Sequence, residues 1–177
     1  MEQTYAIELK NITKRFGKIV ANDGINLKVK RGEILSLLGE NGSGKTTLMN
    51  MISGIYFPDE GHILVDGKAV SIRSPKDSFD LGIGMIHQHF KLIDVMTAAE
   101  NIILGLKGNA VLDMKKVHKD IQELVDRYGF DLDPAQKVYT MSVSQKQTVE
   151  IVKMLYRGAN ILILDEPTAV LTPQEVD

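Results

Sequence analysis

Hydrophobic and polar residues alternate in two stretches near the N-terminus, over Ala6–Leu9 and Ile25–Lys30. A period of two places successive side chains on opposite faces, so both stretches predict half-buried β-strands. The run Ile34–Leu38 is nearly continuously apolar, which predicts a strand covered on both faces, as in a parallel sheet. Asp66-Gly67 separates two further apolar stretches and predicts a two-residue hairpin turn. We therefore expect strands and turns in the first third of the chain.

The middle of the chain has a helical pattern, and capping residues mark where the helices begin. Ser74-Pro75 predicts an N-cap followed by a proline at the first helical position. Capping boxes are present at Thr97–Glu100 and Ser142–Gln145, each just before an apolar helical pattern. Apolar residues recur at helical spacing over residues 117–128, and Gly129 predicts the end of that helix.

The last residues of the sequence also have the pattern of a helix start. Thr172–Glu175 contains a capping threonine, a first-turn proline and a returning glutamate. Only Val176 and Asp177 follow, and a helix this short is unstable because helix nucleation is unfavourable. We therefore expect the sequence to be a fragment of a longer chain.

Length and composition limit the possible functions. The 177 residues are about one domain, and 44% hydrophobic with 25% charged residues allows a core and excludes intrinsic disorder. A net charge of −2 provides no global field for nucleic acid or an anionic membrane, and no apolar run is long enough to span a bilayer. The lack of cysteine and of a signal-peptide pattern fits the cytosol.

The most specific motif follows the apolar run 34–38. Residues 39–46 match G-x-x-x-x-G-K-[ST] and open a predicted helix. Glycines allow successive backbone N–H groups to point at one anion, and the helix N-terminus adds partial positive charge. Lys45 would reach the outer phosphates of a nucleotide, and the Thr46 hydroxyl would ligate Mg²⁺. The predicted nucleotide-binding residues of this loop are Gly39, Glu40, Asn41, Gly42, Ser43, Gly44, Lys45, Thr46 and Thr47.

A second candidate site follows the fully apolar stretch Ile161–Leu164, which predicts another strand. Asp165 and Glu166 stand at its carboxyl end, where ligands of open α/β sheets bind. Asp165 can hold the water shell of Mg²⁺, and Glu166 can orient and deprotonate an attacking water. Without the upstream loop, the two carboxylates would be a solvated strand end.

These motifs together resemble the ATP-binding cassette (ABC) ATPases. The resemblance rests on the phosphate-binding loop, on Gln88 within residues 85–90 (MIHQHF), and on residues 161–172 (ILILDEPTAVLT). It extends from about Tyr5 to the last residue. The HQHF segment, Ala99–Gly105 (AENIILG) and the later V-E-I resemble most closely the ATPase subunits of simple-sugar and nucleoside importers.

The resemblance implies roles for further residues. Phe16 falls where the family has an aromatic that stacks on adenine, although a strand-end core residue is the alternative reading. Gln88 matches the residue that contacts Mg²⁺ and reports nucleotide state to a transmembrane partner. The segment from His89 to about Arg157 corresponds to a helical subdomain that docks on this partner, and residues 169–172 correspond to a loop that communicates across a dimer.

The signature loop departs from the family pattern. Leu-Ser-Gly-Gly-Gln, or Leu-Ser-Val-Gly in this subgroup, is here Met141 followed by Ser142, Val143, Ser144 and Gln145, and the usual arginine is Thr148. In the family this loop closes over the nucleotide of the partner domain, and a glycine at 144 allows close backbone approach. We hypothesise that this domain binds ATP well but serves its partner's site poorly.

The sequence therefore predicts an α/β P-loop core with an N-terminal antiparallel β subdomain and an inserted helical subdomain. The expected nucleotide-binding core is residues 1–88 and 158–177, and the expected helical subdomain is residues 89–157. The expected activity is hydrolysis of ATP, with Mg²⁺, to drive uptake of a sugar or nucleoside. Glu166, Lys45 and Gln88 are the expected catalytic residues, and Thr46, Gln88 and Asp165 the expected metal ligands.

The resemblance also implies partners and location. These are a second ABC domain in a head-to-tail dimer, transmembrane permease subunits and, indirectly, a solute-binding protein, with no nucleic acid. The expected location is the inner face of the cell membrane, as a peripheral protein. Two alternatives stay open: a soluble ABC protein acting on ribosomes or DNA, and a nucleotide-binding switch without turnover. The switch histidine of the family falls beyond Asp177, which is one reason for the second alternative.

Overall fold

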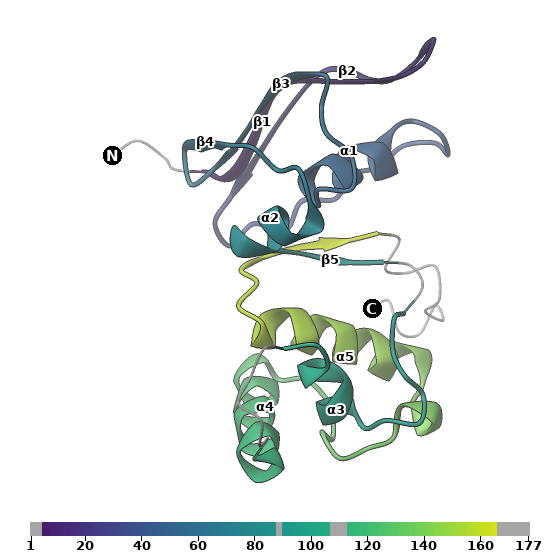
Figure 1. The fold of residues 1–177 in the computed structure, drawn as a ribbon, viewed down its shortest axis with the longest axis vertical. Coiled ribbons are helices and arrows are strands. Elements are labelled where there is room, and N and C mark those ends of the chain that lie inside the picture. The colour runs from purple at the N-terminus through teal and green to yellow at the C-terminus, as the bar shows by residue number, and fades with distance from the viewer. Residues whose placement is uncertain (1–4, 88–89, 107–112, 166–177) are drawn as a thin grey trace. The chain divides into compact units, whose positions relative to one another are not determined.

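The computed structural model describes residues 5–87, 90–106 and 113–165 (Figure 1). The chain forms two compact units, residues 1–84 and residues 85–177. The predicted Gln88, Glu166 and loop 169–172, and the helix expected from Thr172, lie outside the described residues.

An antiparallel sheet of four strands dominates the first unit, in the order β2-β1-β3-β4 (Figure 1). The strands are β1 (Tyr5–Phe16), β2 (Ile19–Lys30), β3 (Glu60–Val65) and β4 (Lys68–Val70). Leu9 of β1 is paired with a residue of β2 on one side and of β3 on the other, and it is fully buried. The alternation at residues 6–9 and 25–30 thus correctly predicted strands, although both strands are longer than the patterns.

The turn between β3 and β4 has the predicted hairpin geometry. Asp66 and Gly67 have φ angles of 50° and 76°, and Val65 is paired with Lys68 across the turn. Positive φ at both central residues defines a type I′ turn, whose twist matches that of the two strands it joins. The Asp-Gly dipeptide therefore determines this connection locally.

The strand predicted over residues 34–38 is not formed, so that prediction was wrong. Residues 33–40 have no regular secondary structure, and Ile34 and Leu38 are 96% and 93% exposed. A strand needs a neighbour with which its backbone exchanges hydrogen bonds, and among the described residues no strand pairs with this segment. The predicted burial on both faces was wrong as well, because hydrophobicity alone does not supply the pairing partner or the covering elements.

Two helices complete the first unit: α1 (Lys45–Ile52), which contacts β2, and α2 (Pro75–Asp80). Ser74 caps α2, because its side chain accepts a hydrogen bond from the Asp77 N–H at 3.2 Å, and Pro75 is the first helical residue, as predicted. The buried Ser78 hydroxyl donates to the carbonyl of Ile52 at 3.0 Å. This bond joins α2 to the last turn of α1.

The second unit is mainly helical, with α3 (Ala98–Ile103), α4 (Met114–Tyr128), a short 3₁₀ turn η1 (Val138–Thr140) and α5 (Val143–Tyr156). Strand β5 (Ile83–Ile86) spans the boundary between the units and forms a two-stranded sheet with β6 (Ile161–Leu164). The apolar faces of the helices share one core, which includes Ala98, Ile102, Val117, Ile121, Val138, Val149 and Val152.

The capping residues place these helices as the sequence predicted. Both capping boxes are complete: Thr97 and Ser142 accept from the N–H groups of Glu100 and Gln145, whose side chains accept from the cap N–H in return. Gly129 ends α4 with a φ of 70°. Each cap satisfies N–H or carbonyl groups that the end of a helix leaves free. The residues that do so are near neighbours in sequence, so the helix ends can be predicted from the sequence.

Candidate functional site

The predicted phosphate-binding loop forms a glycine-rich turn that leads directly into α1 (Figure 1). Gly42 and Gly44 have φ angles of 83° and 87°, in the left-handed region that favours glycine. The N–H of Ser43 donates to the Glu40 carbonyl at 3.2 Å, which closes the turn. Gly44 is the N-cap of α1, and no side chain caps the helix. The N–H groups of its first turn are therefore available to an anion.

Contacts with β2 make glycine necessary at position 44. A Cβ added there would lie 2.3 Å from the Ala21 carbonyl oxygen and 2.9 Å from Nδ2 of Asn22. The same Nδ2 donates to the Gly44 carbonyl at 3.3 Å, from a side chain that is buried. Strand β2 thus contacts the backbone at the start of α1 directly and fixes its position.

The Lys45 side chain folds back over the loop. Its Nζ donates to the carbonyls of Gly39 at 2.7 Å and Glu40 at 2.9 Å, and lies 3.4 Å from Oγ of Ser43. A positive charge therefore lies on the same short loop as the free amides of α1. Amides, a helix N-terminus and an ammonium together form an anion site suited to phosphate.

Phe16 ends β1 and is 41% exposed, which argues against its alternative reading as a strand-end core residue. The Tyr56 ring contacts it in a T-shaped arrangement, with centroids 5.1 Å apart and planes at 72°. Lys14 Nζ lies 5.5 Å from the Phe16 centroid. Tyr56 was not among the predicted site residues. It lies 40 positions from Phe16 along the chain, and no sequence pattern connects the two.

Asp165 follows β6 directly, and its N–H donates to the Ile86 carbonyl of β5 at 3.1 Å. It belongs to the second unit, whereas Thr46 belongs to the first. Among the described residues, no three His, Cys, Asp or Glu side chains gather at one point. The magnesium site of Thr46, Gln88 and Asp165 therefore stays a prediction.

Close to Asp165 in the second unit, His87 follows β5. Burial lowers the pKa of its imidazole, and the nearby positive charge of Lys91 lowers it further. The carboxylates of Asp165 and Glu150 oppose this shift without cancelling it. His87 is therefore neutral at neutral pH.

The signature-loop residues form the start of α5. Ser142 and Gln145 are engaged with one another through the capping box, at 3.2 Å and 3.1 Å. Val143 is exposed. The Thr148 hydroxyl donates back to the Ser144 carbonyl at 3.2 Å, so two of the positions that depart from the family pattern contact each other.

A glycine-rich loop with an inward-folded lysine at a helix N-terminus defines a P-loop nucleotide-binding protein. The sequence profile described as ABC transporter matches residues 22–169. The chain belongs to the ABC transporter family and has its α/β P-loop fold, so the predicted family and fold class are confirmed.

Proteins of similar sequence indicate a subgroup within this family. The chain is 55% identical over 174 residues to the guanosine import ATP-binding protein NupO of Bacillus subtilis, covering 97% of this chain and 34% of that protein. It is 53% identical over 178 residues to the nucleoside import ATP-binding protein NupA of Lactococcus lactis, covering 99% and 35%. The chain thus spans about a third of the length of these relatives. Their names agree with the sugar and nucleoside importer subgroup that the sequence predicted.

Solved structures of similar fold are ABC cassettes. CbiO1 of Clostridium perfringens, part of the ABC transporter complex CbiONQ, gives a TM-score of 0.81 at 30% identity, covering 97% of this chain and 69% of that one. The ADP conformation of an ATP-binding cassette of an ABC transporter gives 0.83 at 26% identity, covering 96% and 72%. Among the helices described, none is long and apolar enough to cross a membrane.

Proposed function

We propose that this chain is the ATP-binding cassette of an importer, which couples ATP hydrolysis to uptake of a small solute. The observation that carries the proposal is the anion site at α1, where Lys45 lies over the loop next to free helical amides. Relatives named as nucleoside and guanosine import proteins support a nucleoside as the solute. A relative named as a ribose import protein, at 42% identity, supports a sugar as the second candidate.

The residues of the first unit would bind the nucleotide. The N–H groups of Lys45, Thr46 and Thr47 would donate to phosphate oxygens, and the Lys45 ammonium would move from its carbonyl partners onto the outer phosphates. The exposed ring of Phe16 would stack on adenine, while its T-shaped contact with Tyr56 would hold the ring in place. Stacking adds affinity without reading much of the identity of the base.

Mg²⁺ fits the chemistry of the residues proposed to hold it. Thr46 is exposed on the first turn of α1, and Asp165 stands immediately after β6, so a hydroxyl and a carboxylate oxygen are available to a hard cation. When bound, Mg²⁺ neutralises the charge that develops on the transferred phosphoryl group. Gln88 would complete the oxygen ligands, and Glu166 would accept the proton of the attacking water.

The second unit would contact partners. Ser142, Val143, Ser144 and Gln145 at the start of α5 would face the nucleotide of a second ABC domain in a head-to-tail dimer. Val95 and Tyr139, 72% and 66% exposed, lie on adjoining backbone, because the Tyr139 N–H donates to the Asp94 carbonyl at 3.1 Å. These apolar side chains support residues 89–157 as the part that docks on a permease at the inner face of the membrane.

In the whole assembly, the cassette would work with a second cassette, a permease and a solute-binding protein. Residues 1–88 and 158–177 would form the nucleotide-binding core, and a solute-binding protein would act through the permease. Two nucleotides would be held between two cassettes, and hydrolysis would release the closed dimer.

Removal of the Lys45 ammonium tests the site. In the full-length protein, Lys45→Ala should weaken binding of Mg-ATP at least tenfold in isothermal titration, because the cation that meets the outer phosphates is lost. Lys68→Ala, on exposed strand β4, removes the same charge from elsewhere in the same unit and should leave affinity unchanged. Equal affinities for the two variants would refute the proposed site.

A turnover assay then separates the ATPase from a switch that only binds. The observation behind the second possibility is Ser144 with Thr148 in the signature helix. Binding of ATP by the full-length protein without phosphate release would favour the switch, and restored turnover in Ser144→Gly would locate the cause.

A further inference from the structure

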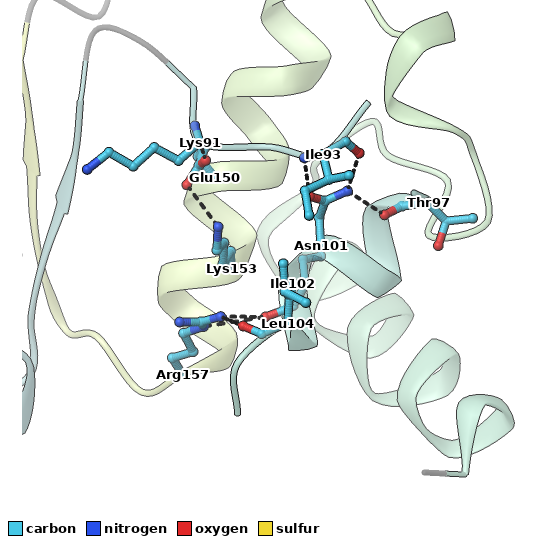
Figure 2. Close-up of polar contacts among 9 residues, drawn as sticks. All are labelled: Lys91, Ile93, Thr97, Asn101, Ile102, Leu104, Glu150, Lys153 and Arg157. Atoms are coloured by element: carbon cyan, nitrogen blue, oxygen red, sulfur yellow. Dashed lines mark hydrogen bonds and ion pairs between the residues drawn. The ribbon is translucent and has the colours of Figure 1, made fainter. Parts of the chain in front are cut away.

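The chain that leaves β5 is held by side chains from two helices of the second unit (Figure 2). Asn101 projects from α3 and is fully buried. Its Oδ1 accepts from the Ile93 N–H at 2.7 Å, and its Nδ2 donates to the carbonyls of Ile93 at 3.1 Å and Thr97 at 3.0 Å. One amide side chain therefore binds both backbone groups of Ile93.

Glu150 holds the same segment from α5. Its Oε1 accepts from the Lys91 N–H at 3.0 Å, and its Oε2 lies 3.7 Å from Lys153 Nζ one turn along the helix (Figure 2). The two side chains are only 8% and 11% exposed. A carboxylate buried to this degree is costly unless both oxygens have partners, and here each oxygen has one.

A third contact joins the two helices. The Arg157 guanidinium, at the end of α5, donates to the Ile102 carbonyl at 3.3 Å and 3.4 Å and to the Leu104 carbonyl at 2.5 Å. These carbonyls belong to the end of α3, where helical geometry leaves them without intrahelical partners. Segment 91–93, α3 and α5 are thus connected pairwise, through Asn101, Glu150 and Arg157 (Figure 2).

We propose that Glu150 and Asn101 are positioning residues for the ATPase reaction, because their hydrogen bonds fix the backbone of segment 91–93 to α5 and α3. The inference rests on the proposed function. Lys91 stands three residues after Gln88, and Glu150 stands two turns after Ser142, about 12 Å along the helix. The Lys91–Glu150 bond therefore fixes the segment after Gln88 relative to the helix that begins after Ser142.

A matched pair of double variants isolates this bond in the full-length protein. E150Q/K153M removes the buried charges but keeps an oxygen that can accept from the Lys91 N–H. E150M/K153M removes the same charges and that acceptor, with nearly the same side-chain volume. The two proteins therefore differ in the side-chain amide at position 150 and in the backbone hydrogen bond that its oxygen accepts.

The readouts are amide exchange at Lys91 and steady-state ATPase kinetics with the permease assembled in nanodiscs. We expect E150M/K153M to exchange the Lys91 amide at least tenfold faster than E150Q/K153M. We also expect a kcat at least fivefold lower, with KM for ATP within twofold. Retention of kcat by the glutamine pair is the conservative rescue that a merely structural role does not predict.

A second variant covers the case in which the methionine pair fails to fold. Lys91→Pro deletes the donor of the same bond and removes only an exposed side chain, so it should lower kcat in the same way. Faster Lys91 exchange at unchanged kcat in E150M/K153M, or an unchanged kcat in the Lys91→Pro variant, overturns the inference while the wild type still hydrolyses ATP. A wild type without permease-stimulated turnover overturns the proposed function, and the inference with it.

Discussion

Gly44→Ala should destabilise the first unit much more than Gly42→Ala, although both glycines have φ angles near 85°. An alanine in the left-handed region costs about 1–2 kcal/mol at either position. At 42 the new Cβ meets nothing within 4 Å. At 44 it would lie 2.3 Å from the Ala21 carbonyl oxygen, well inside the 3.0 Å that real Cβ atoms respect.

The extra penalty at 44 has two parts. Relief of the overlap requires α1 and β2 to move apart, and overpacking of this kind costs about 1–3 kcal/mol. The same movement lengthens the bond from Asn22 Nδ2 to the Gly44 carbonyl, worth about 1 kcal/mol. The gain from a less flexible unfolded chain is common to both variants and cancels. We therefore expect Gly44→Ala to lose about 2–4 kcal/mol more than Gly42→Ala.

The assay is urea unfolding without nucleotide, followed by far-ultraviolet circular dichroism, so that phosphate contacts do not enter the comparison. A difference of 2 kcal/mol is about a thirtyfold change in the ratio of folded to unfolded protein. Agreement of the two free energies of unfolding within 0.5 kcal/mol would refute the reasoning, because it would mean that β2 does not constrain position 44.

Two further predictions concern stability. The hydrogen bond from Lys28, aided by Lys10, holds the pKa of Glu8 below its ordinary value of 4.5, so this carboxylate contributes stability above about pH 4.5 that is lost as pH falls through the lower folded-state pKa. Glu8→Gln should lower the Tm more at pH 7 than at pH 3, and equal shifts at both values would contradict the linkage. Ile121→Ala, in the core of the second unit, should lose about 2–5 kcal/mol in urea unfolding, against less than about 0.5 kcal/mol for the exposed Glu123→Ala. A loss below 1 kcal/mol at Ile121 would contradict the packing described for α4.

The features predicted correctly from the sequence are those decided by a few neighbouring residues. Thr97 and Ser142 start helices because a side chain bonds a backbone N–H three residues away. Asp66 and Gly67 adopt positive φ within their own turn. The turn over residues 39–46 is local in the same sense, since Lys45 bonds carbonyls within the same eight residues, while its binding of phosphate stays a prediction.

The features that were missed or remain open depend on residues far apart in sequence. The strand over 34–38 failed because an apolar pattern contains no information about its pairing partner. The edge contact of Tyr56 with Phe16 and the bond of Glu150 to Lys91 join residues 40 and 59 positions apart. No local pattern announces such contacts, although Asn101 and Glu150 both lay within segments that resembled the importer subgroup.

The hydrogen bonds of Lys45 within its own loop have a consequence for the release of product. The ammonium has two carbonyl partners and a hydroxyl partner in its own loop, so a nucleotide bound as proposed would replace these oxygens with its own phosphate oxygens. The contribution of Lys45 to the binding free energy would then be the difference between its hydrogen bonds to charged phosphate oxygens and those to neutral carbonyl oxygens. Under the proposed function, Lys45 would return to the carbonyls of Gly39 and Glu40 when phosphate departs, so the loop would compete with the remaining nucleotide and favour its release.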